Sequence, residues 1–235
     1  MARITLRQLL DHAAEHDYGV PAFNINNMEQ ALAIMEAANA ADAPVIIQAS
    51  RGARAYANDV MLKHMMDALT EIYPQIPICV HLDHGNEPAT CMTAIQSGFT
   101  SVMIDGSLLP YEENVALTRE VVQLAHAVGV SVEGELGTIG QTGTSVEGGV
   151  SEVTYTDPAQ AEDFVARTGV DTLAVAIGTA HGIYPKGMQP ELQMHILRDI
   201  AGRLSIPLVL HGGSANPDAE IAESVTLGVG KINIS

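Results

Sequence analysis

Histidine and aspartate residues lie together at the end of one short apolar segment. Residues 77–85 read Pro-Ile-Cys-Val-His-Leu-Asp-His-Gly, and an apolar run bounded by proline and glycine is typical of a buried parallel strand. Because side chains alternate along a strand, we expect His81 and Asp83 to share a face, with His84 at the strand's exit. Burying these groups costs free energy unless they are paired or bind something. The segment therefore predicts a functional site, with hydrogen-bonded core histidines as the plain alternative.

Further imidazole and carboxylate side chains lie in or just after other apolar segments. They are Asp105, Glu133, Glu135, His181 and His211. Three imidazoles with an open fourth position are typical of a catalytic zinc site. The carboxylates would then orient the histidines or hold a second cation. For Glu133 and Glu135 the alternative is a buried ion pair, for which cationic partners are scarce.

Asp83 would lie beside such a metal site, where a carboxylate suits proton transfer. His81 is equally well explained as a packing residue or as one that orients a neighbour. Glycine-rich turns follow two of the histidine-bearing segments, at residues 178–182 and 212–214. Such turns let backbone N–H groups approach an anion, although tight turns also favour glycine.

These residues are distributed over eight apolar segments that alternate with helical patterns. The predicted strands are 19–23, 44–49, 77–85, 100–104, 130–136, 170–177, 206–210 and 229–234. An amphipathic stretch, 5–16, precedes them and is predicted to cover one barrel end. This alternation predicts an α/β fold, a (β/α)8 TIM barrel that spans residues 1–235 as a single domain. No pattern for an eighth helix follows the last strand, so we expect the C-terminal helical part to be missing.

The barrel prediction places the candidate residues at the C-terminal ends of the strands, where such barrels carry their active sites. The alternative is a doubly wound open sheet. It would be expected to carry GxGxxG or GxxxxGK[ST] near its first strand, and neither motif occurs.

The composition excludes several classes of partner. A formal net charge of −17 disfavours nucleic acids and anionic membranes, which require a basic surface. No apolar run is long enough to span a membrane, and the N-terminus lacks the apolar core of a signal peptide. Two cysteines without a CxxC motif favour a reducing, cytoplasmic location.

Residues 137–156 interrupt the alternation. This segment is rich in glycine, threonine and serine and has no helical period. A loop of this length in a compact domain is often functional. We predict a mobile lid over the site, with Glu147 as the carboxylate it delivers and Glu152 as the alternative; a plain solvent-exposed loop remains open.

Together these motifs resemble class II, metal-dependent fructose-bisphosphate and tagatose-bisphosphate aldolases along almost the whole chain. The residues that carry the resemblance are 19–24, 81–85, 102–107, 132–137, 174–182, 209–214 and 231–234. The resemblance implies that zinc is bound by His84, His181 and His211. It also implies that Asp83 is the acid and base at the aldehyde oxygen, and that Asp105 and Glu135 serve a second divalent cation or an alternative position of the metal.

The resemblance further implies the substrate contacts. Dihydroxyacetone phosphate would be held by Gly182, Gly212, Gly213, Ser214 and Asn233. The carbonyls of Gly182 and Gly212 would bind a monovalent cation, Na⁺ or K⁺. Asn24 and Ser50 would line the sugar site. A homodimer or homotetramer is the expected assembly.

The implied reaction is the reversible cleavage of fructose 1,6-bisphosphate into dihydroxyacetone phosphate and glyceraldehyde 3-phosphate, as in glycolysis. A divalent metal would stabilise the enediolate that cleavage leaves. The metal-free route needs a Schiff-base lysine. Of the three lysines, Lys63 is predicted to be helical, Lys186 lies in a loop, and Lys231 is predicted at the far end of the barrel from the site.

Two departures and three alternatives accompany this prediction. Neither Glu147 nor Glu152 lies where ungapped counting from the family pattern puts the loop glutamate, and the chain ends at Ser235, where the family usually continues. Tagatose 1,6-bisphosphate, which differs at C4 alone, is the alternative substrate. A non-catalytic barrel subunit would lack several metal ligands. A zinc hydrolase would carry His-x-His on the first strand, which here ends in Asn24.

Overall fold

The protein is described from a computed structural model of the whole chain. The described residues are 3–138, 140–141, 154–181 and 191–235. For Gly140, Gln141, Ala180, His181 and Ala215 the description covers the backbone alone. Glu147, Glu152, Gly182 and Lys186, which the sequence analysis singled out, therefore lie outside the described residues.

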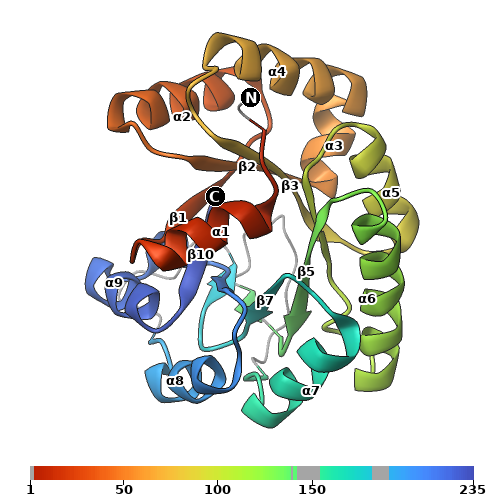
Figure 1. Cartoon of the computed structure of the whole chain (residues 1–235), viewed down its shortest axis with the longest axis vertical. Helices are drawn as coiled ribbons and strands as arrows, with labels where there is room; N and C mark the ends of the chain where they lie inside the picture. Colours follow the sequence, from red (N-terminus) through yellow and green to blue (C-terminus); the bar gives the residue numbers. More distant parts are fainter. Residues whose placement is uncertain (1–2, 139, 142–153, 182–190) are drawn as a thin grey trace.

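Eight parallel strands close into a barrel, which confirms the predicted fold class (Figure 1). Around the barrel each strand pairs with the next one, and the last pairs with the first. The strands are β1 (Val20–Asn24), β2 (Val45–Ser50), β3 (Ile78–Gly85), β4 (Ser101–Ile104), β5 (Ser131–Leu136), β7 (Thr172–Val175), β9 (Leu208–Leu210) and β10 (Val229–Ile234). Such closure leaves no strand edge unpaired and brings the C-terminal ends of all eight strands together at one end.

Helices surround the barrel and bury apolar faces against the outside of the strands (Figure 1). They are α2 (Met28–Ala41), α3 (Arg51–Ala57), α4 (Asp59–Ile72), α5 (Pro88–Gln96), α6 (Tyr111–His126), α7 (Pro158–Thr168), α8 (Met194–Arg203) and α9 (Asp218–Thr226). Of these, α3 is a correction, because the sequence analysis expected no helix between β2 and α4. It is too short to show an amphipathic period, and it begins where the Ser50 hydroxyl accepts a hydrogen bond from the Ala53 amide at 3.3 Å.

Helix α1 (Leu6–Glu15) crosses the N-terminal end of the barrel, as predicted (Figure 1). The Thr5 and Gln8 side chains form a capping box at its start, which satisfies amide groups that the first turn leaves free. Its leucines pack with residues from the starts of three strands, namely Val20, Ile46 and Cys79. The helix therefore closes this end of the barrel with apolar contacts, and the polar groups described below lie toward the other end.

Strand β3 ends in an irregularity. Its pairing with β4 shifts register between Leu82 and Gly85, and His84 adopts a left-handed backbone with φ of +49°. A bulge of this kind redirects a side chain that regular alternation would point to the other face. As a result Asp83 and His84, although consecutive, both reach the barrel mouth.

Short backbone pairings involve the described residues that follow β5. Two short strands, β6 (Gly140–Gln141) and β8 (Ala180–His181), pair in parallel outside the barrel. A bridge also joins Thr138 to Thr154. The sequence analysis did not predict these pairings, because two-residue strands are too short to give a sequence signal. The pairing ties the start of the predicted lid to the backbone of His181.

In the part of the chain that the structure describes, no helix has the length and apolar character needed to cross a bilayer.

Replacing Gly85 tests the bulge. A Cβ on Gly85 would lie 2.5 Å from the Met103 carbonyl oxygen and 3.0 Å from Cys91 Sγ. We expect Gly85→Ala to lower the free energy of unfolding by about 1–3 kcal/mol, the usual cost of overpacking, as measured by urea unfolding. Gly202→Ala is the control, because a Cβ there meets nothing within 4 Å and alanine favours a helix by about 0.5–1 kcal/mol. Equal stability of both variants would contradict the close approach.

Candidate functional site

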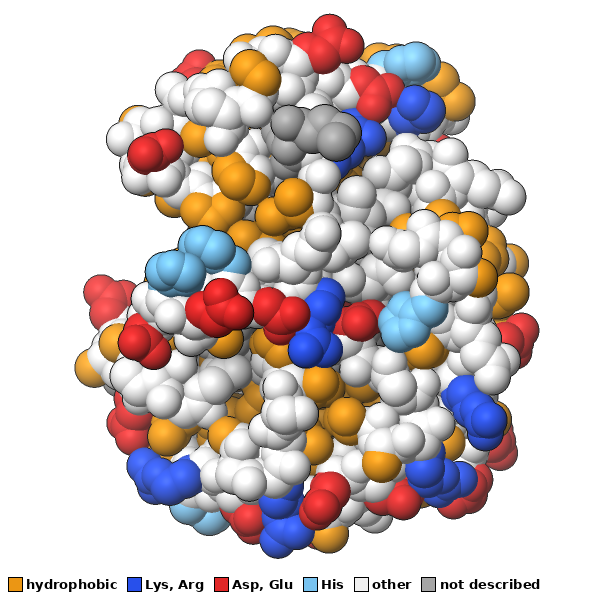
Figure 2. All heavy atoms as spheres, in the orientation of Figure 1, with side chains coloured by type: hydrophobic (Ala, Val, Ile, Leu, Met, Phe, Trp, Pro, Cys, Tyr) orange, Lys and Arg blue, Asp and Glu red, His pale blue; other side chains and the backbone are white. Residues whose placement is uncertain are grey.

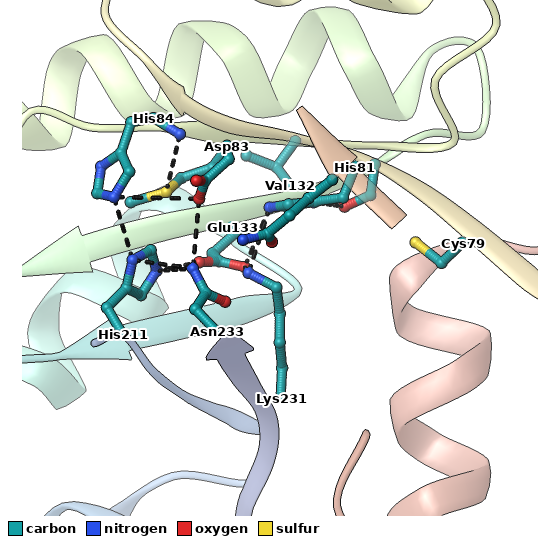
Figure 3. Close-up of polar contacts among 12 residues, drawn as sticks. Cys79, His81, Asp83, His84, Val132, Glu133, His211, Lys231 and Asn233 are labelled. Atoms are coloured by element: carbon teal, nitrogen blue, oxygen red, sulfur yellow. Dashed lines mark hydrogen bonds and ion pairs between the residues drawn. The ribbon is translucent and has the colours of Figure 1, made fainter. Parts of the chain in front are cut away.

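Asp83 is held in one orientation by amide side chains from neighbouring strands. Its Oδ2 accepts a hydrogen bond from Asn24 Nδ2 at 2.9 Å, and its Oδ1 accepts one from Asn233 Nδ2 at 3.3 Å. Gln48 Nε2 in turn donates to Asn24 Oδ1 at 2.6 Å. Asp83 is 1% exposed, so these contacts, rather than water, set the orientation of its carboxylate. Figure 3 shows the contact from Asn233.

Gln48 is a site residue that the sequence analysis missed. It is fully buried, and its Oε1 has no hydrogen-bond partner among the residues that the structure describes. The signal was present in the sequence, because Gln48 precedes Ser50 by two positions and is the polar residue in an otherwise apolar segment. Ser50 itself pairs with Asp83 in the register of β2 and β3, and so lies at the same barrel end.

His84 lies between two carboxylates and a second imidazole. Its Nδ1 is 2.9 Å from Asp105 Oδ2 and 3.9 Å from Glu135 Oε2. Its Nε2 is 3.1 Å from His211 Nδ1 and 4.0 Å from Asp83 Oδ1. Residues from β3 and β5 and from the ends of β4 and β9 therefore meet at one point, as the barrel prediction requires. Figure 3 shows the contact between His84 and His211.

The carboxylates make this point strongly favourable to positive charge. Burial alone would lower the pKa of His84, but Asp83, the hydrogen bond with Asp105, and Glu135 outweigh it and raise that pKa to about 10. Burial raises the pKa of Glu135 well above its usual value, and the nearby Asp105 adds to this. Neighbouring anions that stabilise an imidazolium will also stabilise a metal cation at the same place.

Two overlapping groups of side chains could hold a metal ion. One comprises Asp83, His84 and His211, and the other comprises His84, Asp105 and Glu135; the ligand atoms of each lie within 4.8 Å of one another. Nitrogen and oxygen donors of this kind suit Zn²⁺. Moreover, within the described part of the chain the buried Glu135 Oε2 has no hydrogen-bond partner, and a bound cation would satisfy this oxygen. The residues present therefore fit a metal ion.

Glu133 and Lys231 form a buried ion pair behind His211. Lys231 Nζ lies 2.9 Å from Glu133 Oε2, and both side chains are 0% exposed. The other carboxylate oxygen, Glu133 Oε1, lies 2.8 Å from His211 Nε2. The acceptor fixes the proton of a neutral His211 on Nε2, so that Nδ1 presents its lone pair toward His84.

This ion pair corrects two expectations. Lys231 was predicted at the far end of the barrel, and cationic partners for Glu133 were expected to be scarce. Lys231 instead lies within β10, and its long side chain fills the barrel interior up to the level of Glu133 (Figure 3). The alternative reading of Glu133 as half of a buried ion pair is therefore correct for this residue, whereas Glu135 makes no contact with a lysine or arginine among the described residues.

His81 belongs to the same interior layer. Its Nδ1 is 2.8 Å from Ser101 Oγ, and its Nε2 is 3.4 Å from Lys231 Nζ. Burial, together with the nearby Lys231, holds the pKa of His81 well below its usual value. A neutral, fully buried imidazole agrees with its interpretation as a packing residue that orients its neighbours.

The second glycine-rich turn lies beside β10. Gly212 has a left-handed backbone with φ of +64°, and a Cβ on Gly213 would lie 2.5 Å from Ile232 Cγ2. Ser214 Oγ accepts a hydrogen bond from the Ser235 amide at 3.0 Å. Of the other residues predicted at the site, His181 is described in its backbone alone, and Gly182 and Glu147 lie outside the described residues.

Comparison with known proteins decides the family. The family profile described as "Fructose-bisphosphate aldolase class-II" matches residues 4–235. The chain belongs to the class II fructose-bisphosphate aldolase family. This confirms the resemblance noted in the sequence.

Individual relatives agree with this family assignment. The fructose-bisphosphate aldolase of Rhizobium meliloti (strain 1021) is 53% identical, over 100% of this chain and 77% of that protein. Fructose-bisphosphate aldolase 2 of Cereibacter sphaeroides is 52% identical, over 100% of this chain and 78% of that protein. The crystal structure of the YdjI aldolase from Escherichia coli K12 superposes with a TM-score of 0.85 at 34% identity, covering 99% of this chain and 81% of that one.

This family member is shorter than those relatives within the region they share. The alignment with the Rhizobium meliloti aldolase extends over 276 positions, against 235 residues in this chain. That relative therefore carries residues inside the aligned region that have no counterpart here, in addition to those beyond it. Residue numbers cannot be transferred between the two by simple counting, which agrees with the displaced loop glutamate noted in the sequence.

The ion pair behind His211 can be tested through stability. We expect Lys231→Met to cost about 3–5 kcal/mol in the free energy of unfolding, because it leaves a buried carboxylate unpaired. Adding Glu133→Gln should recover most of this loss, since the amide oxygen can still accept from His211. Urea unfolding of both single variants and the double variant forms a double-mutant cycle. A double variant as unstable as the sum of the two single changes would show that the pair is not coupled.

Proposed function

We propose that this chain catalyses the reversible cleavage of fructose 1,6-bisphosphate into dihydroxyacetone phosphate and glyceraldehyde 3-phosphate. The observation that carries the proposal is the meeting of Asp83, His84 and His211 at the C-terminal end of the barrel, beside the carboxylates of Asp105 and Glu135. Family membership and relatives that are named fructose-bisphosphate aldolases support the same reaction.

His84, His181 and His211 would hold a zinc ion. When bound, the ion supplies Lewis acidity toward the ketose oxygens and so stabilises the charge that C–C cleavage develops. Asp105 and Glu135 would hold a second divalent cation. The carbonyls of Gly182 and Gly212 would hold Na⁺ or K⁺.

Asp83 would move the proton of the hydroxyl on C4. Burial would raise the pKa of this carboxyl group, but His84, His211 and Lys231 lower it below its usual value, so the group is ionised and ready to act as a base in cleavage. In the condensation direction it returns the proton to the aldehyde oxygen. The amides of Asn24 and Asn233 leave it little freedom to rotate, which favours one direction of proton transfer.

The remaining polar groups would bind the substrate. Gly182, Gly212, Gly213, Ser214 and Asn233 would hold the phosphate end and the adjoining carbons, and Asn24 and Ser50 would contact the sugar hydroxyls. The tight approach of Gly213 to Ile232 leaves no room for a side chain, and so keeps backbone N–H groups accessible to an anion. Glu147, or alternatively Glu152, would exchange the proton on the carbon that becomes the enediolate.

Tagatose 1,6-bisphosphate is the second candidate substrate, because it differs from fructose 1,6-bisphosphate only in the configuration at C4. A non-catalytic subunit is less well supported, since Asp83, His84 and His211 are all present and assembled. We further propose a homodimer or homotetramer in the cytoplasm. The net charge of −17 supports the expectation of no nucleic-acid or membrane partner.

The function is tested by assaying cleavage of both sugar bisphosphates with and without metal. We expect fructose 1,6-bisphosphate to be cleaved, the activity to disappear on chelation and to return with Zn²⁺. His211→Ala should abolish both tight zinc binding, measured by metal analysis, and cleavage. Full activity of a metal-free sample would contradict the proposal. Faster cleavage of tagatose 1,6-bisphosphate would show that this sugar, and not fructose 1,6-bisphosphate, is the preferred substrate.

Asp83 and the loop glutamate should affect different steps. We expect Asp83→Ala to retain the metal and lose C–C cleavage by about 10²–10⁴-fold, while proton exchange on dihydroxyacetone phosphate is better preserved. Glu147→Gln should slow that exchange as well as cleavage. Cleavage rates and isotope exchange are measured on the same preparations. Equal loss of both reactions in Asp83→Ala would contradict the role proposed for Asp83. Normal proton exchange in Glu147→Gln together with loss of exchange in Glu152→Gln would identify Glu152 as the base.

A further inference from the structure

Helix α6 carries two buried polar residues on the face that it packs against the barrel. The helix lies against β5 (Figure 1), and its buried apolar residues include Val115, Val121 and Ala125. Asn114 and Thr118 are buried with them, at 2% and 0% exposure, and their spacing of four residues places them together on the helix surface. Apolar side chains of the same shape would pack equally well without losing hydrogen bonds to water. Stability alone therefore does not explain this polar pair.

Asn114 holds the backbone of Glu135 at the end of β5. Its Nδ2 donates a hydrogen bond to the Glu135 carbonyl oxygen at 2.9 Å. Thr118 Oγ1 donates to Asn114 Oδ1 at 3.1 Å, which turns the donating end of the amide toward Glu135. The pairing of β5 with β4 ends at Met103 and Glu133. The Glu135 carbonyl lies beyond that ladder, so the Asn114 side chain replaces the neighbouring strand as its partner.

The position of the Glu135 side chain depends on this support. Among the described residues Glu135 Oε2 has no hydrogen-bond partner, although it lies 3.9 Å from His84 Nδ1. Asp105, the other carboxylate beside His84, is held locally, because its Oδ1 accepts hydrogen bonds from the Ser107 amide at 3.0 Å and hydroxyl at 2.7 Å. The placement of Glu135 relative to Asp105 is therefore set mainly by where its backbone is held.

Asn114 also packs against the chain just after Asp105. A Cβ on Gly106 would overlap Asn114 Oδ1 and would lie 2.9 Å from Asn114 Cγ, so the two residues are in close contact. One side chain thus touches the segment that follows Asp105 and binds the backbone of Glu135. Residues that orient metal ligands in this way tune the affinity of a metal site without touching the ion.

We propose that Asn114 is a positioning residue for the candidate metal group formed by His84, Asp105 and Glu135. It holds the segment after β4 and the end of β5 at the separation at which both carboxylates reach one cation. Thr118 contributes by orienting the Asn114 amide. This inference rests on the cation position at Asp105 and Glu135 in the function proposed above, and it names the residue that sets the geometry of that position.

The test measures manganese affinity in the full chain loaded with zinc. Mn²⁺ is the probe because carboxylate ligands suit it and because electron paramagnetic resonance counts the free ion. Released zinc is measured in the same titration, so that manganese is counted whether it joins the zinc or displaces it. Glu135→Gln should weaken manganese binding, which assigns the ion to this carboxylate. Asn114→Leu, which has nearly the same shape, should weaken it by about 10–100-fold, the usual effect of losing a residue that orients a ligand.

Thr118→Val is a second, milder variant, which serves if Asn114→Leu does not fold. It keeps the volume of the side chain and removes the hydroxyl that donates to Asn114 Oδ1. We expect it to weaken manganese binding by about three- to tenfold, the loss that corresponds to one neutral hydrogen bond.

Two control variants separate positioning from a general loss of stability. Val121→Ala removes buried methyl groups from the same helix, and Leu10→Ala removes them from α1 at the opposite end of the barrel. Figure 2 shows the face of the molecule that α1 crosses. Both variants should lower the melting temperature, because each leaves a cavity, and both should keep the manganese affinity of the wild-type chain.

The outcomes distinguish this inference from the proposed function. Wild-type manganese affinity in Asn114→Leu, or in Thr118→Val if the first variant does not fold, would overturn the inference, as would an equal loss in Val121→Ala. Undiminished binding in Glu135→Gln would overturn it too, because Glu135 would then not be a ligand. In each of these cases zinc binding and cleavage by the wild-type chain stand. A wild-type chain that bound neither zinc nor manganese would overturn the proposed function together with the inference.

Discussion

The buried ion pair between Lys231 and Glu133 is the interaction on which the candidate site depends. Both groups are fully buried, and their charges are separated by 2.9 Å. The carboxylate also contacts His211 Nε2 at 2.8 Å, so the pair sets which nitrogen of that ring faces His84. Desolvating two charges is costly, and here the cost is offset by their mutual attraction and by the hydrogen bond between Glu133 and His211. Lys231 thus influences His211 through Glu133, without contacting that ring itself.

The irregular end of β3 is the second constraint. Regular alternation would send Asp83 and His84 to opposite faces of the sheet. The bulge and the left-handed backbone of His84 bring both side chains into one site, within 4.0 Å of each other. Gly85 permits this because the Met103 carbonyl passes where a Cβ would be. A buried carboxylate and an imidazole can therefore come from adjacent positions, which places them with little dependence on loop geometry.

The barrel separates two kinds of packing along its axis. Toward the N-terminal end, α1 and the strand starts meet through apolar side chains such as Leu9 and Cys79. Toward the C-terminal end, the interior is a connected polar network that includes His81, Glu133 and Asp83. The apolar end supplies rigidity, and the network concentrates charge where ligands can enter, a division common to this fold. It agrees with membership in an aldolase family.

The sequence by itself determined the barrel, its strand order and the strand-end positions of Asp83, His84 and His211, because period and turn signals are local properties of the chain. It also indicated the family through motifs spread over nearly every strand. Only the tertiary structure decided the role of Lys231, which pairs with Glu133, 98 positions away, and of Gln48 in holding Asn24. Those contacts form when the barrel closes and brings residues of different strands to the same height along its axis. No local pattern encodes that height, since it depends on strand register and on the reach of side chains across the interior.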